Sequence, residues 1–288
     1  MNDNFCAFIL THGRPDNVIT YDSLKKQGYT GKIYIVIDDE DKTADQYYKR
    51  FGDEVLMFSK EEMSKTFDEG DNFNDRRCII YARNACFDLA KKVGCKQFIQ
   101  LDDDYTDFLF RVPSGEKLIS ARVTSLDELF LSMLKLFDST TTLTMAMSQG
   151  GDYIGGAGNS HVQKGYKRKA MNSFICDVDR PFKFYGRINE DVNFYTNEGR
   201  KGKLILTIFG PMLNQKQTQS NAGGMTDIYM DKGTYFKSFY SVMYSPSCVK
   251  IALMGRYADS MRIHHRVRWN NATPMILDES TKKKLYSS

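Results

Sequence analysis

The chain has 288 residues, of which 41% are hydrophobic and 26% are charged, so it can bury a core without disulfides or metal. Its apolar runs are far shorter than the ~20 residues of a membrane helix. The first residues show no signal-peptide pattern, and the 6 scattered cysteines, without a CxxC pair, indicate reduced thiols. We therefore expect a globular cytoplasmic protein, and we exclude a disulfide framework and a cysteine-based zinc site.

The net charge of +4 is unevenly distributed along the chain. Residues 1–110 carry 15 basic and 21 acidic side chains, whereas residues 161–288 carry 21 basic and 10 acidic ones. An acidic first half suits the handling of cations, and a basic second half suits contact with a polyanion. Solvated surfaces also vary in charge without any partner, so the division alone leaves both interpretations open.

The first 110 residues predict strands that alternate with helices. Short segments at 5–10 and 32–37 are typical of strands buried on both faces, and further strands are expected at 54–58 and 97–101. Apolar residues at three- and four-residue spacings predict a helix over about 75–93, and Gly94 is placed to end it. This alternation predicts an α/β fold, a three-layer α/β/α sandwich with a mainly parallel central sheet.

The remaining residues have a different character. They predict an apolar helix over 125–137, a glycine-rich segment over 150–158 and a short helix that begins at an acidic pair, Glu190 and Asp191. Residues 261–269 alternate in polarity as a strand does, with His265 on the apolar side and the arginines on the other. No linker long enough to separate two domains is visible, so we expect one domain over 1–288.

Polar clusters follow three of the predicted strands, at residues 11–14, 38–41 and 102–104. The carboxyl ends of neighbouring parallel strands meet at one edge of a sheet, where ligands bind in open α/β folds. If the three strands are neighbours, the three clusters open onto one site. This convergence is the main residue-level reason to expect an active site.

Three consecutive aspartates, Asp102, Asp103 and Asp104, form the last of these clusters. Two carboxylates ~4 Å apart repel by about 4 kcal/mol at an effective dielectric of 20. Bound Mg²⁺ or Mn²⁺ removes this repulsion, and both ions prefer oxygen ligands that they share with substrate phosphates. The alternating residues Asp102 and Asp104 could serve one metal centre. The alternative is a solvated acidic turn.

Each of the other polar residues has one functional and one structural interpretation. Arg83 could clamp a diphosphate with its planar guanidinium, or it is an exposed helix arginine. Asp38 and Asp39 could bind a nucleoside, or they form an acidic loop at a sheet edge. Thr11, His12 and Arg14 form a polar loop at the end of the first predicted strand.

Two late features complete the set. A carboxylate at Glu190 or Asp191 could accept a proton from an attacking hydroxyl, although acids at a helix start more often stabilise the helix dipole. His264 or His265 could reach a metal or a phosphate. Adjacent strand residues point to opposite faces, so at most one of the two histidines can bind the metal directly.

Four segments together resemble a known family. FCAFILTHGRP (5–15), KIYIVIDDED (32–41), YARNACFDLAKKVGCKQFIQLDDDY (81–105) and INEDVNFYTNEG (188–199) are similar to GT-A-fold glycosyltransferases. Their order and spacing are most similar to the TET-associated glycosyltransferases of bacteriophages, a family linked with glycosylation of 5-hydroxymethylpyrimidines in phage DNA. The resemblance covers about residues 5–270. It implies a GT-A-type sandwich in which about 1–110 binds donor and metal and about 111–288 binds the acceptor.

The resemblance also implies residue roles. A nucleotide-sugar donor, expected to be a UDP-sugar, would be held by Thr11, Arg14, Asp38, Asp39, Arg83, Asp102 and Asp103. Asp102 and Asp104 match the DxD motif and would hold Mn²⁺ or Mg²⁺, with His264 or His265 reaching the metal or diphosphate. Asp191 matches the catalytic base of the xED motif, with Glu190 as the other candidate. The doubled histidine departs from the family pattern and leaves that assignment open.

The implied activity is transfer of a sugar to the hydroxyl of 5-hydroxymethylcytosine in phage DNA, in the cytoplasm of the bacterial host. No membrane or obligate protein partner is expected. Candidate acceptor-side loops are 155–159 and 217–224. Candidate phosphate contacts are Lys164, Lys167, Arg168, Lys169, Arg262, Arg266 and Arg268. Two alternatives stay open, namely a GT-A enzyme acting on a glycan or another non-nucleic-acid acceptor, and a catalytically idle DNA-binding module.

Overall fold

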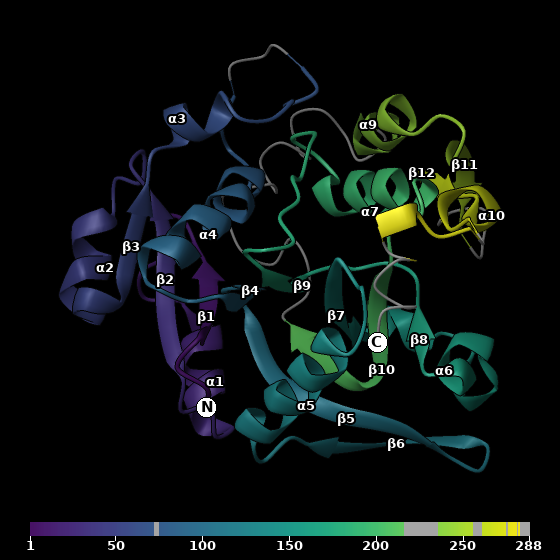
Figure 1. The fold of residues 1–288 in the computed structure, drawn as a ribbon, viewed down its shortest axis with the longest axis horizontal. Coiled ribbons are helices and arrows are strands. Elements are labelled where there is room, and N and C mark those ends of the chain that lie inside the picture. Colours follow the sequence, from purple (N-terminus) through teal and green to yellow (C-terminus); the bar gives the residue numbers. More distant parts are fainter. Residues whose placement is uncertain (72–74, 216–235, 256–260, 275, 281, 283–288) are drawn as a thin grey trace.

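A computed structural model describes residues 1–71, 75–215, 236–255, 261–274, 276–280 and 282 (Figure 1). Ten strands form one large sheet in the order β3-β2-β1-β4-β9-β7-β10-β5-β6, with β8 paired to β10. The strands are β1 Phe5–Leu10, β2 Lys32–Asp38, β3 Val55–Phe58, β4 Gln97–Asp102, β5 Tyr105–Ser114, β6 Lys117–Arg122, β7 Thr144–Gln149, β8 Tyr166–Lys167, β9 Ser173–Asp177 and β10 Ile205–Gln215.

The sheet is mainly parallel in strand direction. Strands β3, β2, β1 and β4 pair in parallel, as do β7 and β10. The antiparallel pairings leave β6 in the same direction as these six strands, whereas β5, β8 and β9 run the opposite way. The four strands predicted from apolar runs are β1, β2, β3 and β4, and they lie side by side. The acidic and basic parts of the chain thus contribute to one continuous sheet.

Helices cover both faces of the sheet because its central strands are apolar on both sides. In β1, Phe5, Ala7 and Ile9 belong to one core cluster, and the alternate residues Cys6, Phe8 and Leu10 belong to the other. The first cluster includes side chains of α1 (Ile19–Lys26), α2 (Ala44–Phe51) and α5 (Leu126–Asp138). The second includes α3 (Lys60–Ser64), α4 (Ile80–Lys92) and α7 (Glu190–Arg200). The predicted three-layer α/β/α fold is confirmed.

One predicted helix boundary is wrong. The apolar spacing predicted a helix from about residue 75, but α4 begins at Ile80. The Asp75 carboxylate accepts hydrogen bonds from the backbone and side chain of Arg77, which gives residues 75–77 a local turn instead of a helical one. The predicted apolar helix at 125–137 corresponds to α5, and the Ser125 hydroxyl caps its first turn.

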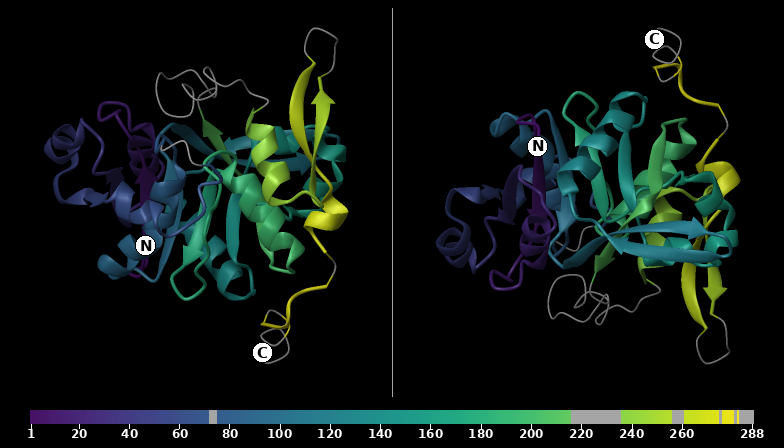
Figure 2. Two further views of the ribbon diagram at one scale, coloured as in Figure 1. Left: turned by 90° about the horizontal axis from the view of Figure 1, so that it is seen from above. Right: turned by 90° about the horizontal axis from the view of Figure 1, so that it is seen from below.

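A smaller unit follows the main sheet. It consists of α9 (Phe236–Tyr244), a two-stranded antiparallel ribbon of β11 (Val249–Met254) and β12 (Arg262–Val267), and the short α10 (Trp269–Ala272). Figure 2 shows the ribbon at the periphery of the molecule, with its free end directed outward. Short helical segments elsewhere are η1 Gly52–Glu54, η2 Gly150–Tyr153, η3 Gly156–Gly158 and α6 Ser160–Lys164.

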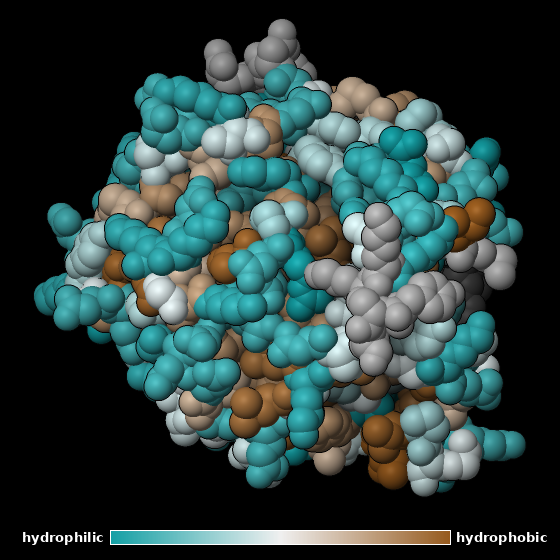
Figure 3. All heavy atoms as spheres, viewed as in Figure 1, coloured by the Kyte–Doolittle hydropathy of each residue, from teal (hydrophilic) through white to brown (hydrophobic). Residues whose placement is uncertain are grey.

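The surface is mainly hydrophilic on the face seen in Figure 3, with apolar side chains between the polar ones. Within the ranges that the structure describes, no helix has the length and apolar character needed to cross a membrane. The candidate loop at 217–224 lies outside the described residues.

Candidate active site

The three polar clusters lie together at one edge of the sheet. Strand β1 is between β2 and β4 and is parallel to both, so the loops after these strands meet. The Thr11 hydroxyl donates to Oδ2 of Asp103 at 2.7 Å, and His12 Nδ1 hydrogen-bonds Oδ2 of Asp38 at 2.7 Å. The Gly13 amide donates to Oδ2 of Asp41 at 2.7 Å. Each contact joins the loop after β1 to one of its neighbours.

Asp103 is buried and ties the first loop to the aspartate triplet. Its Oδ2 accepts from Thr11 and forms an ion pair with Arg14 Nη2 at 3.1 Å. Burial raises the pKa of Asp103 to about 6, although the charge of Arg14 partly offsets this effect. Thr11 and Arg14, both predicted to hold the nucleotide, are thus positioned by Asp103. About a third of the Arg14 side chain remains exposed beside the triplet.

Asp38 is also buried and has cationic neighbours. Its carboxylate contacts His12, and Lys60 Nζ lies 3.0 Å from its Oδ1. Burial alone would raise its pKa, but the hydrogen bond with His12 and the charge of Lys60 outweigh burial and lower the pKa. Asp39 is exposed, and its Oδ1 accepts from the backbone of Lys60 at 2.9 Å. Lys60, a buried lysine five residues after Val55, was not among the predicted site residues.

Asp104 lies half-buried beside the other two aspartates. Burial, and then the charges of Asp102 and Asp103, raise the pKa of Asp104 to about 6. This unfavourable clustering of carboxylates is the electrostatic condition that a divalent cation relieves. Oxygen ligands from one or two carboxylates, completed by substrate phosphates, are the usual magnesium environment. The oxygen donors of Asp102 and Asp104 suit the chemistry of Mg²⁺ or Mn²⁺, and these two residues are the candidate ligands.

The two histidines are not part of a closed metal cluster. Across the described part of the chain, no group of three or more His, Cys, Asp or Glu side chains is arranged to hold a metal ion. His265 Nδ1 lies 3.3 Å from Nδ2 of Asn189, the residue before the acidic pair of α7. Burial, and then the charges of His264 and Lys237, lower the pKa of His265 to about 4, so its imidazole is neutral. His264 hydrogen-bonds the carbonyl of His265.

Arg83 joins the aspartate triplet to the late acidic pair. Its side chain is buried, with Nη2 at 3.1 Å from Oδ1 of Asp102 and Nε at 3.0 Å from Oε1 of Glu190. Phe174 and Phe184 lie against the guanidinium. Arg83 Nη1 is buried and, in the described structure, has no hydrogen-bond partner. Arg83 is therefore a bridge between two carboxylates, and the interpretation as an exposed helix arginine is wrong.

The acidic pair occupies the first turn of α7. Asn189 before it adopts a left-handed conformation with φ of 56°, which asparagine tolerates better than most residues. Asp191 is half-buried, and burial together with the charge of Glu190 raises its pKa to about 7. A carboxylate with a pKa near neutrality is suited to accept a proton in general base catalysis. Glu190, by contrast, is bound to Arg83.

A buried ion pair that sequence reasoning missed lies near Asp191. Lys169 contacts Asp152, and both side chains are largely buried. The positive charge of Lys169 is one of the influences that lower the pKa of Asp191, against the larger effect of burial. Asp152 also accepts a hydrogen bond from the backbone of Gln149 at 3.1 Å. Lys169 had been predicted only as a phosphate contact, because its sequence neighbours are basic.

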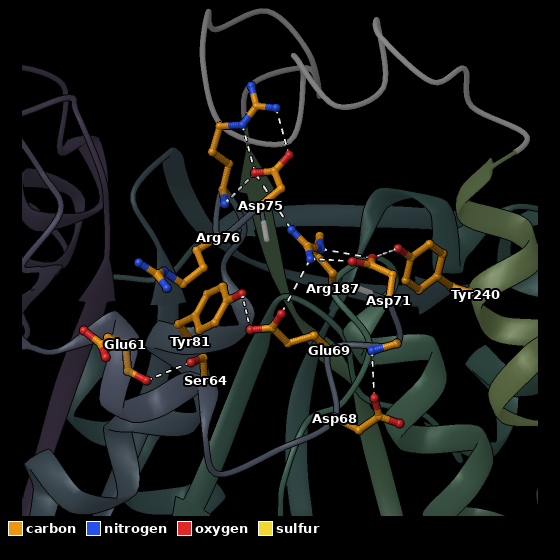
Figure 4. Close-up of polar contacts among 12 residues, drawn as sticks. Glu61, Ser64, Asp68, Glu69, Asp71, Asp75, Arg76, Tyr81, Arg187 and Tyr240 are labelled. Carbon is orange, nitrogen blue, oxygen red and sulfur yellow. Dashed lines mark hydrogen bonds and ion pairs between the residues drawn. The ribbon is translucent and has the colours of Figure 1, made fainter. Parts of the chain in front are cut away.

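Arg187 fixes the segment that leads into α7. Figure 4 shows its guanidinium between Glu69, Asp71 and Asp75, with Tyr240 also directed at Asp71. Nε of Arg187 donates to Oδ2 of Asp71 at 3.1 Å, and its side chain is 2% exposed. This buried network holds residues 69–71 against the chain just before Glu190. No sequence signal marked Arg187, because its acidic partners are more than 100 residues away.

Comparison with known proteins identifies a matching family and several solved structures of similar fold. A sequence model of the TET-associated glycosyltransferases matches residues 5–224. No curated protein matches the chain. Similar solved structures include a mycobacterial protein, with 8% identity over 93% of this chain and 88% of the other and a TM-score of 0.47. Another is glucosyl-3-phosphoglycerate synthase from Mycobacterium tuberculosis in complex with Mg²⁺ and uridine diphosphate, with 8% identity, coverage of 92% and 88%, and a TM-score of 0.45.

Proposed function

The chain belongs to the TET-associated glycosyltransferase family, and from that premise we propose that it moves a sugar from a UDP-sugar to the hydroxyl of 5-hydroxymethylcytosine in DNA. The observation that carries the proposal is the bridge through Arg83. This arginine joins Asp102, in the triplet suited to a cation, to Glu190, beside a carboxylate with a pKa near neutrality. Through Arg83, the proposed cation-binding aspartates and the proposed base would lie at the same site.

The donor would bind at the edge formed by the loops after β1, β2 and β4. Arg14 has a partly exposed side chain there that could contact a phosphate, and Asp39 is exposed after β2. Asp102 and Asp104 would hold Mg²⁺ or Mn²⁺ together with the diphosphate. When bound, the cation supplies positive charge that stabilises the departing diphosphate. His265, near the acidic pair, is the better placed of the two histidines for a ligand on that side.

Asp191 would act as the base. Its carboxylate accepts the proton of the hydroxymethyl group while that oxygen forms a bond to the anomeric carbon. The bond from the anomeric carbon to the diphosphate oxygen breaks, and its electron pair leaves with the nucleotide. The backbone hydrogen bond of Val192 and the charges of Arg83 and Lys169 keep the pKa of Asp191 lower than burial alone would make it. Arg83 would act as a positioning residue that holds Asp102 and Glu190.

The acceptor part of the proposal is supported by charge. Residues 161–288 carry 21 basic and 10 acidic side chains, and DNA is the acceptor that such an excess suits. A hydroxymethyl group on a base within a duplex must be brought out of the stack or reached from the groove, and extruding a base costs a few kcal/mol. Phosphate contacts offset such a cost.

The test is a screen of UDP-sugars against hydroxymethylcytosine DNA, unmodified DNA and simple glycans, with the products digested to nucleosides and identified by mass. We expect a nucleoside heavier by one sugar, formed only with hydroxymethylated DNA and a divalent cation. Asp104→Asn should abolish most of the sugar transfer, and the remaining transfer should no longer depend on the cation. The matched control is Asp88→Asn, which changes an aspartate of α4 whose side chain is 71% exposed.

The outcomes separate the parts of the proposal. Transfer to a glycan but not to DNA would overturn the acceptor and favour the first alternative. DNA binding without consumption of any donor would favour the idle binding module. Full transfer by Asp104→Asn would remove this residue from the metal site.

A further inference from the structure

We infer that the ribbon of β11 and β12 is a binding surface for the double helix of the acceptor, an inference that rests on the proposed function. The ribbon has two different faces, because cross-strand partners in an antiparallel pair point to the same side. One face carries Lys250, Ala252 and Met254 of β11 opposite Arg266, His264 and Arg262 of β12. We call this the cationic face.

The cationic face contains an arrangement that does not help the ribbon to fold. Lys250 lies directly opposite Arg266, and like charges at such positions are destabilising. Lys250, Arg262 and Arg266 are all exposed, and so is Arg268 just beyond β12. None of these four cations has a salt-bridge partner within the described part of the structure. By comparison, buried Arg187 has three acidic partners. An anionic partner outside the chain accounts for this unbalanced charge.

The opposite face attaches the ribbon to the active site. Val249 and Val267 pack with Cys248 and Ala272, and α9 lies against both strands. His265, on this inner face, contacts Asn189 immediately before Glu190 and Asp191. A ligand on the cationic face is therefore held at a fixed position relative to the proposed base. The ribbon is thus anchored at the end of this face that carries Val249 and Val267, and its cationic face is open.

The shape of the ribbon favours a duplex over a single strand. A two-stranded β-ribbon fits the major groove of B-DNA, where its cations can reach phosphates on both sides. The ribbon extends outward from the body, as both views of Figure 2 show. Single-strand binding instead uses exposed aromatic platforms. Among the described residues of the ribbon, the exposed apolar side chains are not aromatic. They are Leu253, Met254, Ile263 and, just before β12, Met261.

The experiment measures binding without catalysis. A labelled, unmodified 20-base-pair duplex is titrated with the full chain by fluorescence anisotropy, without donor, over a range of salt concentrations. The test variant is Lys250→Gln/Arg266→Gln. Its matched control is Lys26→Gln/Lys92→Gln, which removes two exposed cations at the ends of α1 and α4 and changes the net charge equally.

We expect the test variant to reduce the salt slope of log K by about 2 and to raise the Kd by at least roughly tenfold at 0.1 M salt. The control should bind as the unaltered chain does. Thermal unfolding of both variants checks that they fold, and relief of the like-charge pair predicts that the test variant is no less stable. Equal losses in test and control would overturn the inference, since net charge alone would then explain binding. The duplex assignment would be overturned if the chain bound a single strand of the same sequence as tightly as the duplex and the test variant lost both affinities equally.

The two proposals can fail separately. If the chain glycosylates hydroxymethylcytosine DNA but the ribbon variant keeps its duplex affinity, the ribbon inference is wrong and the proposed function stands. If the ribbon variant loses duplex affinity but no sugar is transferred to any DNA, the proposed function is wrong.

Discussion

Replacement of Arg83 by methionine should destabilise the fold and expose the electrostatic role of this bridge. The change keeps an unbranched apolar side chain but removes the guanidinium between Asp102 and Glu190. Breaking a buried ion pair by removing one partner typically costs about 3–5 kcal/mol. The side chain of Asp102 is 24% exposed and that of Glu190 is 13% exposed, so partial solvation lowers the expected cost to about 3 kcal/mol.

That free energy corresponds to a measurable shift in melting temperature. The unfolding entropy of a chain of 288 residues makes 3 kcal/mol equivalent to roughly 5 °C.

Thermal unfolding is the assay, with two comparison variants. Arg83→Lys keeps the charge but not the forked geometry and should lie between the parent and Arg83→Met. Arg76→Met removes an exposed ion pair with Glu40 and should cost less than about 1 kcal/mol. A loss of stability for Arg83→Met no larger than that for Arg76→Met would refute the reasoning.

Two further predictions concern the proposed base. The value of kcat/KM should decrease as the pH falls below about 7, because Asp191 must be ionised to accept a proton. Asp191→Asn should lower kcat by roughly 10²–10⁴-fold and abolish this acidic limb of the pH profile. The control Asp88→Asn should leave the profile unchanged. Lys169→Met should cost about 2–4 kcal/mol, because buried Asp152 would keep only the longer ion pair with Lys167 at 4.0 Å. It should also move the acidic limb to higher pH, because Lys169 lowers the pKa of Asp191; an unmoved limb would show that Lys169 does not act on the base.

Local patterns predicted the parts of the site that depend on strand order. The strands β1, β2 and β4 are rich in apolar residues because both sheet faces are covered, and their ends could be placed from sequence. Once these strands are parallel neighbours, the meeting of Thr11 with Asp103 follows. The start of α4 was misplaced because helical spacing does not register a competing side-chain turn at Asp75.

Long-range partners could not be predicted in the same way. Arg83 and Glu190 are separated by 107 positions, and nothing in either segment specifies the other as its partner. The same holds for Lys169 with Asp152 and for Arg187 with Asp71. The predicted role of Asp38 also lacked its buried contact with Lys60, because lysine rarely lies inside a fold and its pattern resembles that of a surface residue.

The raised pKa of Asp104 has a consequence for the abundance of the protein. Three carboxylates at one strand end make the ligand-free folded state less stable than three uncharged side chains there would. A ligand that binds only the folded state stabilises that state by RT ln(1 + [L]/Kd). A supply of cation and nucleotide would thus slow unfolding-dependent proteolysis, and their depletion would speed it. The lifetime of the protein in a cell would then follow the concentration of its own donor.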